Sequence, residues 1–174
     1  WGEYKVKKLR LFKVGEPLLN PDVCKMVKYA KDARVAEFIE ITTNGTLLNE
    51  EMNQGLIDAG LDILNISVNG INEEKYRTAC QYDLKFDEFR HAIEHFYRNK
   101  GTCKLFLKYS DIGYTEEEKD NFYQLFGNIC DEIFIETISA TLWQDTNIND
   151  HVVNAHQGTY GQKLDCSNFC PYVP

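Results

Sequence analysis

The chain has 174 residues, of which 43% are hydrophobic and 26% charged, so it is long enough to bury the core of one globular domain. Its 19 lysines and arginines stand against 27 aspartates and glutamates, which gives a formal net charge of −8. This acidity argues against nucleic-acid or anionic-membrane partners, and no apolar run approaches the roughly 20 residues that cross a bilayer.

The predicted elements alternate along the chain between short apolar runs and amphipathic helical patterns. Asn20-Pro21 predicts the N-cap and first residue of a helix, Asn49 and Gly60 begin and end a second one, and Thr115 to Glu118 has the form of a capping box. Five apolar runs predict strands, with one or two helical patterns between each pair, over 9–14, 38–42, 63–68, 104–109 and 133–138.

This alternation predicts an α/β fold with right-handed crossovers and a parallel sheet. Five strands fit either an open doubly wound sheet or part of a (β/α) barrel, and composition does not decide between them. In both architectures ligands bind at the carboxyl ends of the strands. The residues there are mostly neutral hydrogen-bonding groups, which suit a polar small molecule: 15–17, 43–45, 67–70, 108–111 and 136–141.

The segments that follow the first three strands resemble the radical S-adenosylmethionine (radical SAM) superfamily. They read GEPLLNPD at 15–22, ITTNGTLL at 41–48 and GLDILNISVNG at 60–70, in that order. The resemblance runs over residues 8–138 and implies strands two to six of a partial (β/α)6 TIM-like barrel. It implies that the family's first strand and cluster-binding loop are missing from this chain.

The same resemblance implies contacts to S-adenosylmethionine at successive strand ends. Gly15 and Glu16, with the backbone of Val14, are expected to receive the methionine amino group, because a carboxylate accepts well from an ammonium. The other expected contacts are Thr43, Asn44, Ser67 and Asn69 for the ribose or the methionine carboxylate, Lys108 for that carboxylate, and Ile138 for adenine.

The cysteines divide into two groups. Members of the family hold a [4Fe–4S] cluster through C-x3-C-x2-C, and no such triplet occurs in this sequence, so the cluster ligands are expected outside it. The isolated cysteines at 24, 80, 103 and 130 are predicted to be reduced, small buried residues, as in a cytoplasmic protein. Cys170, and less strongly Cys166, resemble the first ligands of an auxiliary iron–sulfur cluster in a SPASM-like extension.

Two domains are therefore expected: a barrel portion over 1–142, and a linker with the start of the cysteine-rich extension over 143–174. The resemblance implies an enzyme that generates a 5′-deoxyadenosyl radical and abstracts hydrogen from a peptide, sugar-type or other small-molecule substrate. A reductant such as flavodoxin or ferredoxin is its implied partner. Without the cluster motif, the chain alone is expected to be inactive.

Two alternatives remain open on the sequence: a non-catalytic barrel scaffold, and a metal-independent (β/α) barrel enzyme of small-molecule metabolism. The strand at 9–14 is expected to lie at an exposed edge, and a free strand edge favours pairing with another chain. Dimerisation through this edge is therefore a further expectation.

Overall fold

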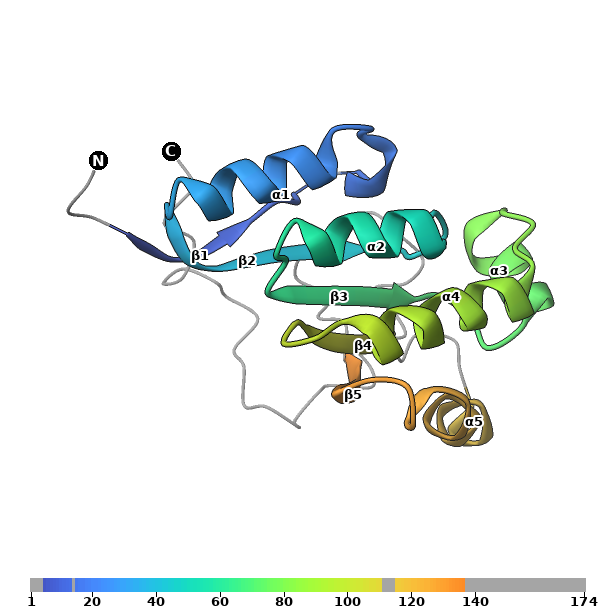
Figure 1. Cartoon of the computed structure of the whole chain (residues 1–174). Coiled ribbons are helices and arrows are strands. Elements are labelled where there is room, and N and C mark those ends of the chain that lie inside the picture. Colours follow the sequence, from blue (N-terminus) through green and yellow to red (C-terminus); the bar gives the residue numbers. More distant parts are fainter. Residues whose placement is uncertain (1–4, 14, 111–114, 137–174) are drawn as a thin grey trace, which may run out of the picture. The chain divides into compact units, whose positions relative to one another are not determined.

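A computed structural model of the protein describes residues 5–13, 15–110 and 115–136, and the fold is given for these residues. Five parallel strands form one sheet in the order of the chain (Figure 1). They are β1 (Val6–Arg10), β2 (Ala36–Thr43), β3 (Ile63–Val68), β4 (Lys104–Ser110) and β5 (Glu132–Glu136). The helices between them are η1 (Pro17–Leu19), α1 (Val23–Asp32), α2 (Glu50–Asp58), α3 (Glu73–Cys80), α4 (Phe86–Asn99) and α5 (Glu116–Phe126).

The strand order decides between the two architectures that the sequence allows. A doubly wound sheet reverses its strand order at a switch point, whereas this sheet runs from β1 to β5 without a reversal. Right-handed crossovers that always advance in one direction place their helices on one face of the sheet, as in a barrel. The predicted α/β class and partial-barrel winding are therefore confirmed.

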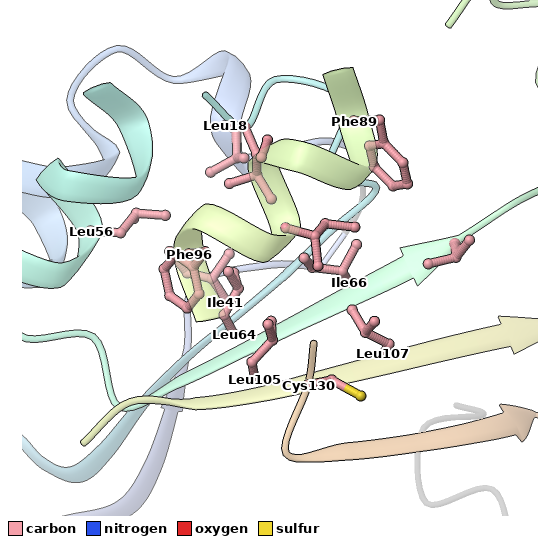
Figure 2. Packing of buried hydrophobic residues seen from close by; sticks show 14 of the residues in the cluster. Leu18, Ile41, Leu56, Leu64, Ile66, Phe89, Phe96, Leu105, Leu107 and Cys130 are labelled. Carbon is pink, nitrogen blue, oxygen red and sulfur yellow. The ribbon is translucent and has the colours of Figure 1, made fainter. Parts of the chain in front are cut away.

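The core lies between the sheet and its helices. Alternate strand residues such as Ile41, Ile66 and Leu107 are fully buried there, because successive side chains of a strand point to opposite faces. Phe89 and Phe96 of α4 point from the helix toward these strand residues (Figure 2). The amphipathic patterns of the sequence thus correspond to real buried faces.

Most predicted helix ends are confirmed, but one is wrong. Asn49 caps α2 through its side chain, and Thr115 forms the capping box of α5. Asn20 is not an N-cap, because α1 begins only at Val23 with Asp22 in the capping position. The Asn20 Oδ1 atom instead accepts from the backbone N–H of Asp22 at 3.0 Å, so this side chain stabilises a turn before the helix.

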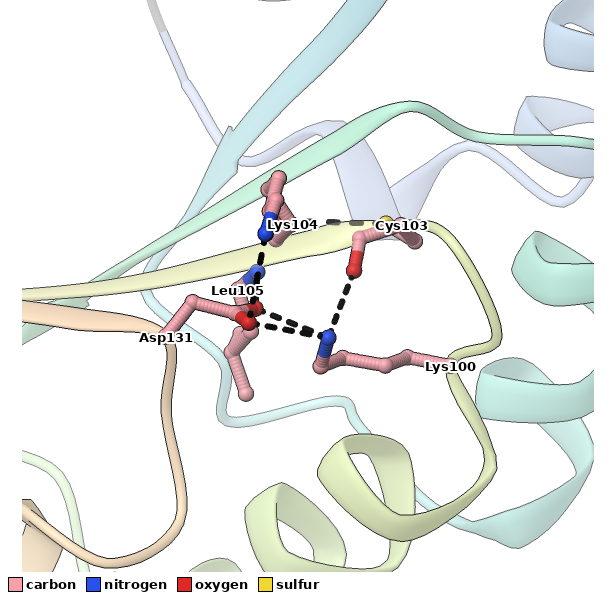
Figure 3. A network of polar contacts seen from close by, with 5 residues as sticks. All are labelled: Lys100, Cys103, Lys104, Leu105 and Asp131. Carbon is pink, nitrogen blue, oxygen red and sulfur yellow. Dashed lines mark hydrogen bonds and ion pairs between the residues drawn. The ribbon is translucent and has the colours of Figure 1, made fainter.

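An ion pair between Lys100 and Asp131 lies at the amino-terminal end of β4 and β5 (Figure 3). The Asp131 carboxylate accepts from the backbone N–H of Leu105 at 2.8 Å and pairs with the Lys100 ammonium at 2.9 Å. Asp62 repeats this arrangement, since it accepts from the backbone N–H of Ile39 at 2.8 Å and pairs with the Lys31 ammonium. Each aspartate therefore connects a strand to the neighbouring strand and to a helix.

We expect Asp131→Asn to lower the free energy of unfolding by roughly 1–3 kcal/mol, the usual cost of losing hydrogen bonds to a charged group. Burial alone raises the pKa of the Asp131 carboxyl, but its bonds to Leu105 and Lys100 outweigh burial and hold the pKa below its usual range. The stabilisation is thus present above about pH 4 and is lost as pH falls through the folded-state pKa. Urea unfolding of both proteins at neutral and acidic pH measures how the difference in unfolding free energy depends on pH.

The matched control is Asp120→Asn, on the exposed side of α5, which is expected to leave the unfolding free energy nearly unchanged. A pH-independent difference between Asp131→Asn and the unaltered protein contradicts the charge argument.

None of the helices within the described residues has the length and apolar character of a membrane span.

Candidate functional site

Glu16 connects the segment after β1 to the carboxyl end of β2. Its Oε1 atom accepts from the backbone N–H of Leu18 at 3.0 Å and from the Thr43 hydroxyl at 2.5 Å. Its Oε2 atom accepts from the backbone N–H of Asn44 at 2.8 Å. Three donors from two chain segments therefore fix this carboxylate in one position, as a binding site for an ammonium group requires.

Thr43 lies behind Glu16. Its side chain is only 2% exposed, and its hydroxyl accepts from the backbone N–H of Gly45 at 2.9 Å while donating to Glu16. The resemblance implies a direct cofactor contact for Thr43, but its hydroxyl proton is already used by the carboxylate. In this arrangement Thr43 positions Glu16.

Two cavities meet at Glu16 and Asn44. The first, here called the inner cavity, has a volume of about 440 Å³ and is lined by Lys13, Gly15, Glu16, Thr42, Asn44 and Ser67, among others. Gly15 has φ +94° and open space where a Cβ atom would lie, so the backbone after β1 reaches the cavity wall in a conformation that suits glycine.

The second cavity, here called the loop cavity, has a volume of about 280 Å³. Besides Glu16 and Asn44 it is lined by Asn69, Tyr76, Cys80 and Tyr82. The backbone N–H of Asn69 donates to the Tyr76 hydroxyl at 3.2 Å, so a fully buried helix residue fixes the loop that follows β3. Sequence reasoning did not single out Tyr76, because a tyrosine on a helical stripe looks like any other core residue.

Lys108 stands apart from both cavities. It is the register partner of Ser67 on the neighbouring strand, yet it lines neither cavity, and its ammonium pairs with the Glu136 carboxylate at 2.9 Å. The structure thus brings six predicted residues together around the two cavities and leaves Lys108 beside them. Those six are Gly15, Glu16, Thr43, Asn44, Ser67 and Asn69. The predicted contacts of Val14, Ile138, Cys166 and Cys170 fall outside the described residues.

The described residues fit the amino-acid part of S-adenosylmethionine but do not fit an iron–sulfur cluster. A fixed carboxylate and neutral amide and hydroxyl groups are suitable partners for ammonium, carboxylate and ribose groups. No group of three metal-ligating side chains occurs within residues 5–136 as described. Burial raises the pKa of the Cys103 thiol to about 12 and that of Cys130 to about 11, which disfavours the thiolates that iron binds.

The prediction of four buried cysteines is partly correct. Cys103 and Cys130 are buried and Cys24 is half-buried, whereas Cys80 is exposed. Cys80 is exposed because it is the last residue of α3 and lines the loop cavity. None of these four cysteines forms a disulfide.

Comparison with known proteins gives a match to a family model. The family model described as the radical SAM superfamily matches residues 3–125. A GTP 3′,8-cyclase of Chlorobaculum tepidum is 36% identical over 123 residues, which are 69% of this chain and 36% of that protein. The chain therefore spans only about a third of the length of this relative.

Solved structures give the same fold. SuiB of Streptococcus suis bound to S-adenosylmethionine has a TM-score of 0.59 at 13% identity and covers 85% of this chain and 34% of its own. SuiB bound to the precursor peptide SuiA has a TM-score of 0.60 at 12% identity, with the same two coverages. At such identities the likeness shows the fold alone.

Proposed function

The chain belongs to the radical SAM superfamily, and from this premise we propose that its two cavities hold the S-adenosylmethionine of a hydrogen-abstracting enzyme. The family's cofactors are S-adenosylmethionine and a [4Fe–4S] cluster. The observation that carries the proposal is the Glu16 carboxylate, fixed by Leu18, Thr43 and Asn44 at the junction of both cavities.

Each predicted residue at the two cavities has a proposed role. Glu16 accepts hydrogen bonds from the methionine ammonium, and Gly15 offers its backbone beside it. Asn44 and Ser67 bind the carboxylate or ribose. The Asn44 Oδ1 atom already accepts from the Thr46 backbone N–H at 2.9 Å, so Nδ2 is the part of this amide that faces a ligand.

Asn69 is assigned to the ribose or carboxylate as well, and Thr43 positions Glu16. When bound, the cofactor supplies the 5′-deoxyadenosyl group that takes a hydrogen atom from substrate in this family. The walls of the two cavities orient that group and exclude water from it. The described residues include no group of side chains that could hold the cluster.

We propose that residues 1–142 are the barrel portion and that 143–174 are a linker and the start of a cysteine-rich extension, with Cys170 and Cys166 as candidate ligands of an auxiliary cluster. Iron quantification after anaerobic reconstitution of the protein and of a Cys170→Ser variant tests this. Equal iron content in both contradicts the assignment.

Two substrate classes have support. The Chlorobaculum tepidum relative is named a GTP 3′,8-cyclase, which favours a purine nucleoside triphosphate. One of the structural neighbours is bound to a precursor peptide, which favours a peptide. A sugar-type substrate, the third expectation from the sequence, has no comparable support.

Cys80 offers a direct test of cofactor binding. It lines the loop cavity with Asn44 and Asn69, so we expect S-adenosylmethionine to slow its alkylation by N-ethylmaleimide by roughly tenfold at saturation. Peptide mass spectrometry follows each cysteine separately. Cys24 of α1, which contacts Met52 of α2, is the internal control and is expected to keep its rate. An unchanged Cys80 rate contradicts the proposed site.

A further inference from the structure

One face of the sheet is not covered by the described helices and is here called the inner face. The alternation of the strands shows which residues lie on it. Ile39 and Ile41 of β2, and Leu107 and Tyr109 of β4, are buried against the helices. Their neighbours in sequence therefore point to the opposite side. The basic, acidic and aromatic members of that face are Lys8, Arg10, Phe38, Glu40, Lys104, Phe106, Lys108, Glu132, Phe134 and Glu136.

Every basic side chain on the inner face of the described strands has a carboxylate partner. At the amino-terminal end, Glu40 is only 5% exposed and pairs with Lys8 at 2.6 Å and Arg10 at 3.8 Å. Lys104 pairs with Asp131 at 3.7 Å. The inner face therefore presents matched charges rather than a positive patch.

One of these pairs lies at the carboxyl end of the sheet, the edge where ligands of such folds bind. The ammonium of Lys108 and the carboxylate of Glu136 are 2.9 Å apart near the carboxyl ends of β4 and β5. The two side chains are 27% and 50% exposed, so a ligand can reach both. Phe134, the register partner of Lys108, is 41% exposed and adds apolar surface beside the pair.

We infer that the substrate group held by Lys108 and Glu136 is the backbone of a peptide and not a phosphate; the inference rests on the proposed function. An amide offers a carbonyl to the ammonium and an N–H to the carboxylate, so both charges keep a partner. A triphosphate gains attraction from Lys108 but meets repulsion from Glu136 at nearly the same distance. Phe134 then contacts a peptide side chain.

Lys108 is thereby assigned to substrate binding and not to cofactor binding. The resemblance implies that Lys108 binds the methionine carboxylate, whereas the ion pair and the lining of the two cavities place it outside them. Positive charge from the rest of this chain is scarce, because residues 137–174 contain one lysine and no arginine. Besides Lys108, the lining of the two cavities contributes one cation, Lys13, which is few for the several negative charges of a triphosphate.

The first experiment measures S-adenosylmethionine affinity by calorimetry in Lys108→Gln, Glu136→Gln and Ser67→Ala. We expect the first two to bind within about twofold of the unaltered protein and Ser67→Ala to bind roughly tenfold more weakly. A tenfold loss in Lys108→Gln overturns the inference and leaves the proposed function standing. Failure of the unaltered protein to bind the cofactor contradicts the proposed function itself. Thermal unfolding monitored by circular dichroism confirms that each variant is folded.

The second experiment titrates the cofactor-loaded protein with tripolyphosphate, GTP and the capped dipeptide N-acetyl-phenylalanyl-alanine amide, followed by amide NMR shifts. The dipeptide is expected to shift the amide signals of Lys108 and Phe134. The Glu136→Gln variant is expected to bind the dipeptide roughly tenfold more weakly. Glu136→Lys is expected to tighten tripolyphosphate binding by about the same factor. Absence of dipeptide shifts at these positions, or GTP binding tighter than the dipeptide and lost in Lys108→Gln, overturns the inference.

Discussion

Replacing Glu16 by glutamine is expected to weaken S-adenosylmethionine binding by roughly 10- to 100-fold, the range for losing a hydrogen bond between two charged groups. In the folded protein Oε1 accepts from Leu18 and Thr43 and Oε2 from Asn44. A glutamine has one acceptor oxygen, so its NH2 group faces an N–H or O–H donor in either orientation. Both the charge and the fixed position are lost. Isothermal calorimetry gives the affinity.

The control for this substitution is Glu37→Gln, which removes a carboxylate from the exposed start of β2 and is expected to bind normally. Thr43→Ser keeps the hydroxyl that donates to Glu16 and is expected to bind within about threefold, whereas Thr43→Val is expected to resemble Glu16→Gln. Equal affinities in Thr43→Ser and Thr43→Val contradict the positioning role of this threonine.

Gly45→Ala is expected to destabilise the protein by roughly 2–5 kcal/mol. Gly45 has φ +74°, a conformation that costs other residues about 1–2 kcal/mol. An added Cβ atom lies 2.8 Å from Cγ2 of Ile66 and 3.0 Å from Cε2 of Phe89, and such overpacking in a core costs a further 1–3 kcal/mol or so. Urea unfolding followed by circular dichroism measures the sum.

Gly101→Ala separates the two contributions. Gly101 has φ +57° but nothing within 4 Å of the position of a Cβ atom, so only the conformational cost of about 1–2 kcal/mol is expected. If both variants lose the same stability, the close approach of Gly45 to Ile66 and Phe89 has no energetic effect. The Asn44-Gly45 pair would then be an ordinary turn.

The candidate site could be predicted in part because ligands of such folds bind at strand ends, which hydrophobic patterns locate. Asn44 and Ser67 were found in this way, and the structure places them around one cavity. The role of Thr43 could not be predicted, because a hydroxyl at a strand end has the same sequence signal whether it faces a ligand or a neighbouring carboxylate. In the structure Thr43 is buried and its hydroxyl donates to the Glu16 carboxylate.

The sequence by itself determined the α/β class, the last four strands and most helix ends, since these depend on local periodicity and on capping side chains such as Asn49 and Thr115. The apolar pattern predicts the first strand at 9–14, whereas β1 is Val6–Arg10, because its lysines hide an edge strand from such a pattern. The sequence did not determine the ion pair of Lys108 with Glu136 or the bond of Asp131 to Leu105, because each joins residues more than 25 positions apart. Such pairs exist only once parallel strands are in register, and the register follows from how the helices pack on the sheet.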